Sequence, residues 1–261
     1  MTWALQRQLL YIIILILIFS LLGFFFLSSV FSKPPTCEDG KQNGGESGVD
    51  CGGLCKRACL AQVDEISILW ARSFKVVPGR YNAVAYVENH NPSEAVSKIN
   101  YRFRFADENN VYIGKREGST YIPPSGRFAI FEPGIDSGNS VPVYTTFEFT
   151  ETPEWIRISP EKMRDIRVTV SDINLTGEKE SPALSAMIKN DSLFFLKDVD
   201  VVAILYGKDK NVVSASRTYL ELLRPEESKD IHFTWPEPLP AEVVTKEIIP
   251  IYNIDLAEHR Q

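Results

Sequence analysis

The sequence predicts a mainly β protein with one N-terminal transmembrane helix, a small disulfide-linked stalk and two tandem antiparallel β-sandwiches. Two observations predict this fold class. Residues 87–131 and 188–232 align without a gap at a constant offset of 101 residues, which indicates two copies of one sandwich-sized unit. Ahead of them, residues 9–31 carry no charge. The expected domain boundaries are 1–8, 9–31, 33–61, 64–158 and 163–258.

The uncharged segment 9–31 is long enough to cross a bilayer. At about 1.5 Å per residue, such a helix spans the roughly 30 Å hydrocarbon core. A cleaved signal peptide is the alternative, but its apolar region usually has only about 7–15 residues. Arg7 is the only charged side chain before the segment. The positive-inside rule therefore predicts a single-pass cell-membrane protein, with residues 1–8 in the cytoplasm and the C-terminal bulk outside.

All four cysteines follow directly after this segment, at Cys37, Cys51, Cys55 and Cys59. The stalk around them is too short and too poor in apolar residues to bury a core, so it needs cross-links to be ordered. An even number of cysteines in an exported segment predicts two disulfides, whose pairing the sequence leaves open. Zinc is the alternative, although the spacing lacks the Cys-x2-Cys pairs of common structural zinc sites.

The stalk also carries oxygen ligands at short intervals, separated by glycines that let a loop curl tightly. Calcium takes six to eight oxygens, so these residues are candidate ligands of a calcium ion, the one cofactor that the sequence suggests. The alternative is that these residues only form turns. The spacing is not that of an EF-hand. The predicted ligands are Asp39, Asn43, Glu46 and Asp50.

The pattern from Cys37 to Cys59 resembles a short cysteine-rich module of exported bacterial and protist proteins. Its shared elements are Cys-x-Asp-Gly, Asn-Gly-x-Glu-x-Gly-Val-Asp-Cys-Gly-Gly and the two closing cysteines. The chain departs from the pattern at the end, where three residues rather than two precede the last cysteine. The resemblance implies export and no particular activity.

Residues 64–258 have the character of antiparallel β-structure. Apolar residues alternate with polar ones in short runs, and turn-forming Pro, Gly, Asn and Asp residues separate the runs. At the offset of 101, the core-type residues Tyr101, Phe103 and Phe105 fall on Val202, Ile204 and Tyr206. Two units joined by a short segment are expected to form a rod. The predicted strands are 65–76, 81–89, 97–106, 111–118, 126–132 and 141–149, then 166–174, 183–190, 197–206, 212–219, 228–235 and 243–252.

A shared strand pattern in both units resembles a known family. Each unit has a strand ending in Asn, a polar gap, an apolar-aromatic strand, a short turn and a later Pro-containing turn. This pattern resembles the FxLYD-type domain and the related sandwich of type 2 late-embryogenesis-abundant proteins. The resemblance implies an Ig-like, non-catalytic sandwich that serves as a scaffold or binds a partner. Gly207 departs from it, because the family has Asp after Leu-Tyr. The residues that carry it are Asn89, Phe103, Phe105 and Pro124, then Asn190, Val201, Leu205, Tyr206 and Pro225.

One loop of the second unit is unusually apolar. Leu193, Phe194 and Phe195 follow a turn, and because an exposed apolar cluster marks a binding surface, they are candidates for a partner-binding patch. The alternative is that these residues pack onto the adjoining domain or enter the next strand.

The sequence contains no linear catalytic signature. It has no Gly-x-Ser-x-Gly, phosphate-binding loop or His-Glu-x-x-His motif, and its three histidines are isolated. A net charge of −6 does not suit nucleic acid, which requires basic patches. The predicted function is a binding or envelope-scaffold module without catalysis. Its partners are the lipid bilayer, through residues 9–31, and a protein or envelope component. The alternative is an extracytoplasmic hydrolase whose carboxylates come from distant loops.

Overall fold

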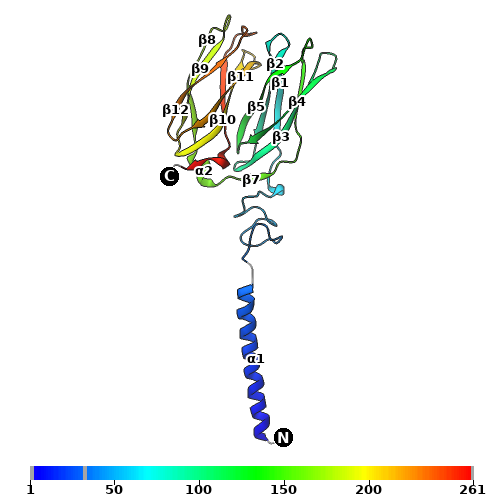
Figure 1. Cartoon of the computed structure of the whole chain (residues 1–261), viewed down its shortest axis with the longest axis vertical. Coiled ribbons are helices and arrows are strands. Elements are labelled where there is room, and N and C mark those ends of the chain that lie inside the picture. The colour runs from blue at the N-terminus through cyan, green and yellow to red at the C-terminus, as the bar shows by residue number, and fades with distance from the viewer. Residues whose placement is uncertain (1–2, 32–33, 260–261) are drawn as a thin grey trace.

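The computed structural model describes residues 3–31 and 34–259 and has the predicted mainly β architecture (Figure 1). Helix α1 (Trp3–Phe31) stands apart from the rest of the chain, with the stalk between it and two β-sandwiches. Within it, Trp3–Leu27 is long and apolar enough to cross a membrane. A signal sequence can meet the same criteria of length and composition. The helix begins before the predicted segment 9–31.

The first sandwich consists of two antiparallel sheets with strand orders β1-β2-β5 and β4-β3-β6, and the short strand β7 pairs with the start of β3. Tyr101, Phe103 and Phe105 of β3 fill its core together with alternate residues of β2 and β5. The strands are β1 (Ser67–Val77), β2 (Arg80–Asn89), β3 (Glu94–Ala106), β4 (Tyr112–Ile122), β5 (Gly126–Asp136), β6 (Tyr144–Phe149) and β7 (Trp155–Arg157).

The second sandwich repeats this topology, with sheets β8-β9-β12 and β11-β10-β13, and β14 pairs with the start of β10. Helix α2 (Pro160–Asp165), capped by the side chain of Ser159, leads into it from β7. The sequence patterns did not predict the short strands β7 and β14. The strands are β8 (Val168–Thr176), β9 (Ala183–Asn190), β10 (Phe194–Tyr206), β11 (Val212–Leu223), β12 (Ser228–Thr234), β13 (Thr245–Ile251) and β14 (Glu258–His259).

The ungapped alignment of the two units is wrong over β10 and most of β11. Asn89 and Asn190 correspond at the expected offset. However, β3 spans Glu94–Ala106 and β10 spans Phe194–Tyr206, so these two strands correspond at an offset that is one residue smaller. The loop before β10 is one residue shorter, and a one-residue shift moves every side chain to the other face of the sheet. The core of the second sandwich therefore contains Val201, Ala203 and Leu205.

The two sandwiches stack face to face, so that four sheets form four layers (Figure 1). The β1-β2-β5 sheet packs on the β11-β10-β13 sheet, and Val202, Ile204 and Ile249 join the buried cluster of the first sandwich. The Glu247 carboxylate accepts hydrogen bonds from Tyr86 at 2.7 Å and from Tyr206 at 2.6 Å, one tyrosine from each sandwich. The expectation of a rod is therefore wrong.

Differences between the two repeats explain why the stack has four layers. Residues 83–87 and 201–205 are continuous apolar runs, and all of them are buried because their sheets are covered on both faces. On the outer layer of the first sandwich, the positions that correspond to Val202 and Ile204 are Arg102 and Arg104, which form ion pairs with glutamates. Each sandwich thus has one apolar outer face, and these two faces cover each other.

Two buried tyrosines, Tyr86 and Tyr101, and the half-buried Tyr206 make the stability of this stack decrease at alkaline pH. Burial, followed by a hydrogen bond to a carboxylate, raises the pKa of Tyr86, Tyr101 and Tyr206 above the usual value near 10. Because the folded state holds these protons more tightly, their contribution to stability is complete below pH 10 and is lost as the pH rises toward the folded-state pKa.

We therefore expect the free energy of unfolding to fall above about pH 10, by up to about 1.4 kcal/mol per pH unit for each such tyrosine. Urea unfolding between about pH 8 and 11 measures this slope. Tyr206→Phe should reduce it, whereas the exposed Tyr144→Phe should not. An equal slope in the unsubstituted protein and in both variants would contradict the assignment of this pH dependence to the three tyrosines.

Candidate functional site

Two disulfides hold the stalk, as the sequence predicts. Cys37 pairs with Cys55, and Cys51 pairs with Cys59, with Cα–Cα distances of 5.7 and 5.0 Å. This resolves the pairing that the sequence left open. No free thiol remains among the described residues, so the zinc alternative has no thiolate ligand here.

The predicted calcium ligands bind the backbone of their own loop. Both carboxylate oxygens of Asp50 lie 3.0 Å from the amide of Gly40, and one oxygen of Glu46 accepts from the amides of Asn43 and Asp50. Asp39 accepts a hydrogen bond from the Asn43 side chain at 2.9 Å, which lowers the pKa of that carboxyl. These contacts resemble those of a turn-forming linker.

The acidic side chains of the stalk do not converge on one point. In the described part of the chain, the one group of three ligand-type side chains that comes together is Cys37, Glu46 and Cys55, and its two sulfurs form a disulfide. Calcium binding by Asp39, Asn43, Glu46 and Asp50 stays a prediction.

The stalk is docked onto the edge of the first sandwich. The amide of Ala58 donates to the carbonyl of Trp155 at 3.0 Å, and the amide of Arg157 donates to the carbonyl of Lys56 at 2.7 Å. Arg57 and Ile156 form an antiparallel bridge between them. The Arg157 side chain also donates to the carbonyl of Gly53. Residues 56–58 therefore cover an otherwise free strand edge at β7.

A pair of buried asparagines ties the chain to the same sandwich where it leaves the stalk. Asn91 accepts from the amide of Asp64 at 2.7 Å and donates to its carbonyl at 2.9 Å. The Asn89 side chain oxygen accepts from Asn91, and its nitrogen donates to the carbonyls of Glu94 and Pro123 at 2.8 Å. The asparagine that ends β2 thus fixes three neighbouring segments.

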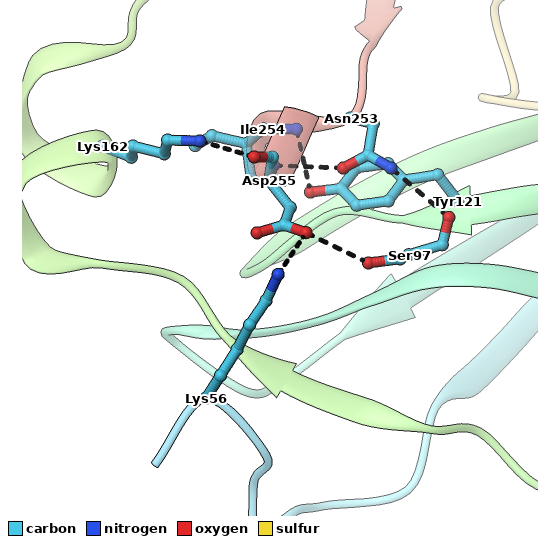
Figure 2. Close-up of polar contacts among 7 residues, drawn as sticks. All are labelled: Lys56, Ser97, Tyr121, Lys162, Asn253, Ile254 and Asp255. Atoms are coloured by element: carbon cyan, nitrogen blue, oxygen red, sulfur yellow. Dashed lines mark hydrogen bonds and ion pairs between the residues drawn. The ribbon is translucent and has the colours of Figure 1, made fainter. Parts of the chain in front are cut away.

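Asp255 joins the stalk, both sandwiches and the connecting helix at one place (Figure 2). It lies in the single turn η2 (Ile254–Leu256), where the side chain of Asn253 accepts from its amide at 3.0 Å. Its carboxylate pairs with Lys56 of the stalk at 2.8 Å and accepts from Ser97 of β3 at 3.4 Å. Its carbonyl accepts from Lys162 of α2.

At this junction the stalk is joined to the ends of both sandwiches that lie nearest to it. Figure 2 also shows Tyr121 of β4 accepting from the amide of Ile254 at 3.4 Å, and Asn253 donating to the carbonyl of Ser97 at 3.3 Å. The sequence did not predict it, because Lys56 and Asp255 are 199 residues apart and nothing local marks them as partners.

We expect Lys56→Met to loosen the stalk without unfolding the sandwiches. Lys56 is 64% exposed, so its ion pair is worth only about 0–1 kcal/mol. Amide hydrogen exchange at Ala58, whose amide is bound to Trp155, should speed up by a factor of up to about five. Lys41→Met is the control, because Lys41 lies in the same stalk and its side chain is exposed. Faster exchange throughout the sandwiches would show a different role.

The apolar loop of the second unit is largely part of the strand that follows it. Strand β10 begins at Phe194, which is 4% exposed in the core and contacts the ring of His259 edge-to-face at 5.0 Å. Phe194 therefore does not belong to an exposed patch, because alternate residues of a strand point inward. Leu193 is 48% exposed and Phe195 is half-buried. Partner binding by these outward side chains stays a prediction.

Acidic residues also line a cavity between the bases of the two sandwiches, and a carboxylate-dependent hydrolase needs a group of acids of this kind. The cavity has a volume of about 520 Å³ and includes Asp198, Asp200 and Glu258. Burial raises the pKa of Asp200, and Arg217 at 3.4 Å opposes this shift. Asp198 accepts from Tyr219, and Glu258 pairs with Lys197. Each carboxylate therefore has a partner within the protein.

Comparison with known proteins identifies no family for this chain. No protein-family model matches it, and no curated protein matches it. Solved structures that match include red sea bream transglutaminase, with 10% sequence identity and a TM-score of 0.24. The match covers 73% of this chain and 31% of the transglutaminase chain, so this chain spans less than a third of the length of the transglutaminase. At that TM-score the similarity says nothing about activity.

Proposed function

We propose that this protein is a single-pass, membrane-anchored module that holds two stacked sandwiches outside the cytoplasm and binds a protein or envelope partner without catalysis. The observation that carries this proposal is the apolar helix α1 followed by a disulfide-linked stalk that docks at the base of the sandwiches. Disulfides persist in oxidising compartments, which supports an extracytoplasmic stalk. The resemblance of both repeats to FxLYD-type domains supports a binding or scaffold role.

The docked stalk is held in one arrangement against the stacked sandwiches. Helix α1 ends at Phe31, and the first disulfide begins at Cys37, so only a short segment separates the apolar helix from the cross-linked stalk. Residues 56–58 then pair with β7, and Lys56 pairs with Asp255 of the second sandwich. Such an arrangement suits a protein that holds its sandwiches close to a membrane anchor.

An exposed apolar surface lies at the end of the first sandwich away from the stalk. Strand β3 begins beside β7 at the stalk end and finishes at Ala106, which pairs with Tyr112 of β4 and with Tyr144 of β6. Both tyrosines are more than half exposed, and exposed apolar clusters mark binding surfaces. We name this surface the distal patch. It consists of Val111, Tyr112, Val141, Val143 and Tyr144.

The anchoring part of the proposal is tested by protease treatment of spheroplasts. External protease should digest residues after about 33 and leave α1 in the membrane, because the positive-inside rule places the N-terminus in the cytoplasm. A soluble mature protein lacking α1 would contradict the anchor and support the signal-peptide alternative.

The binding part is tested by cross-linking the intact protein in its native membrane. Tyr112→Ser combined with Tyr144→Ser should abolish specific cross-linked products and leave the melting temperature within a few degrees, because both side chains are exposed. The matched control is Tyr219→Ser, which removes an exposed tyrosine from β11. Unchanged products in the double variant would remove the distal patch as the binding surface.

A further inference from the structure

Two asparagines lie in the sequence Asn-x-Ser/Thr, with x other than proline, which is the acceptor sequence for N-linked glycans in exported proteins. They are Asn174, in Asn-Leu-Thr, and Asn190, in Asn-Asp-Ser. A serine also follows two residues after Asn91, but a proline stands between them. The two acceptor sequences occupy opposite environments in the second sandwich.

The structure excludes Asn190 as an acceptor. This residue is completely buried, and its side-chain nitrogen donates to the carbonyls of Phe194, Leu223 and Arg224. Ser192 is also buried, and its hydroxyl donates to the side-chain oxygen of Asn190 at 2.6 Å. A sugar on the Asn190 nitrogen would displace these bonds and open the loop, so it is incompatible with the folded chain.

Asn174, in contrast, is exposed on β8, the edge strand of the outer sheet β8-β9-β12 (Figure 1). Leu175 packs on the core of the second sandwich. Because successive side chains of a strand point to opposite faces, Asn174 and Thr176 both point outward. The Asn174 side chain makes no hydrogen bond to another residue in the described part of the chain, so its amide nitrogen is accessible.

A β-bulge directly before Asn174 loosens this part of the strand. Ser171 pairs with Met187 and Asn174 pairs with Ser185, so residues 172–173 face a single residue of β9. On its other side, β8 has no partner strand among the described residues. A bulged strand that is paired on one side only opens locally at a lower free-energy cost than a central strand. A transferase can therefore bind the acceptor sequence as an extended segment.

The other positions of this acceptor sequence are also exposed. Thr176 supplies the hydroxyl, which makes a long hydrogen bond of 3.4 Å to the carbonyl of Ala183. Asp172 lies two residues before Asn174 and is exposed in the bulge. Some bacterial oligosaccharyltransferases also bind an acidic side chain at this position, where the buried acceptor sequence has isoleucine.

We propose that Asn174 is an acceptor for an N-linked glycan, which rests on the proposed placement of the sandwiches outside the cytoplasm. The donor is an oligosaccharide linked to a polyprenyl diphosphate. The amide nitrogen of Asn174 forms a bond to C1 of the first sugar, and the bond between C1 and the phosphate oxygen breaks. The polyprenyl diphosphate leaves with the bonding electrons, the amide gives one proton to the transferase, and nothing is oxidised or reduced.

The test is expression of the full-length protein in bacterial cells that carry an oligosaccharyltransferase and its polyprenyl-diphosphate-linked oligosaccharide. The intact mass should rise by one glycan, and peptide mapping should place the glycan on Asn174 and leave Asn190 unmodified. Asn174→Gln and Thr176→Ala should lose the added mass, whereas Thr176→Ser should keep it because the hydroxyl remains. Both side chains are exposed, so the melting temperature of each variant should stay within a few degrees.

Val111→Thr separates failure of this site from failure of the proposed placement. It completes an acceptor sequence at Asn109, in the exposed turn between β3 and β4, with Asp107 two residues before it. In this variant we expect a glycan on both Asn109 and Asn174.

Three outcomes would overturn the proposal. A glycan on Asn109 but none on Asn174 would remove Asn174 as an acceptor and leave the extracytoplasmic placement in force. A chain without a glycan at either position would contradict both the acceptor and the placement. A glycan on Asn190 of the folded protein would show that burial does not select between the two acceptor sequences.

Discussion

Replacing Ile204 by Ala is expected to lower the free energy of unfolding by about 2–5 kcal/mol and to destabilise both sandwiches together. Ile204 is fully buried and belongs to β10 of the second sandwich, yet it lies in the apolar cluster of the first. Its loss leaves a cavity between the two middle sheets of the stack. Urea unfolding followed by circular dichroism measures the change, and should show one transition moving as a whole.

The control for Ile204→Ala is Val244→Ala, which also removes apolar side-chain atoms from the second sandwich. Val244 is 54% exposed, so its truncation should change stability by less than about 0.5 kcal/mol. If Ile204→Ala instead split the unfolding curve and left the first sandwich unchanged, the two sandwiches would be independent bodies, as in a rod.

Asn190→Ala is expected to lower the free energy of unfolding by about 2–4 kcal/mol, because several buried groups lose their partner at once. The Asn190 side chain nitrogen donates to the carbonyls of Phe194, Leu223 and Arg224 at 2.7–3.3 Å. Its oxygen accepts from both the amide and the hydroxyl of Ser192. Asn190 is completely buried, so water cannot replace these bonds without opening the loop.

Thermal and urea unfolding of Asn190→Ala measure this effect, with Asn109→Ala as the matched control. Asn109 lies in the exposed turn between β3 and β4, and its truncation should be nearly neutral. Asn89→Ala should resemble Asn190→Ala, because Asn89 makes the equivalent contacts in the first sandwich. A loss below about 1 kcal/mol at Asn190 would show that the loop adapts to the missing side chain.

Asn89 and Asn190 show what the comparison of the two repeats could predict and what it could not. Their repetition at the end of equivalent strands was visible in the alignment, and the structure explains it by the same buried contacts in both repeats. The alignment is wrong in the strand that follows these asparagines. A single-residue difference in the following loop shifts β10, and no local pattern distinguishes Val201 from Val202 as the core residue, since both are apolar and buried.

One feature of the stack could have been predicted from the sequence. Residues 83–87 and 201–205 are apolar without alternation, which is typical of strands covered on both faces. In the second repeat, the positions that correspond to 83–87 include Ser185 and Met187. In the first repeat, the positions that correspond to 201–205 include Arg102 and Arg104. Comparison of the repeats would have shown that each has one apolar outer face.

Local sequence patterns predict the apolar helix, the cross-linked stalk and the strands of two similar sandwiches. These depend on residues close together in the chain, whose spacing alone sets helix length, strand alternation and turns. The pairing of Cys37 with Cys55, the junction of Lys56 with Asp255 and the face-to-face stack are visible only in the folded chain. Each of these depends on which distant surfaces bury apolar area or pair charges, and that is set by the folded chain as a whole.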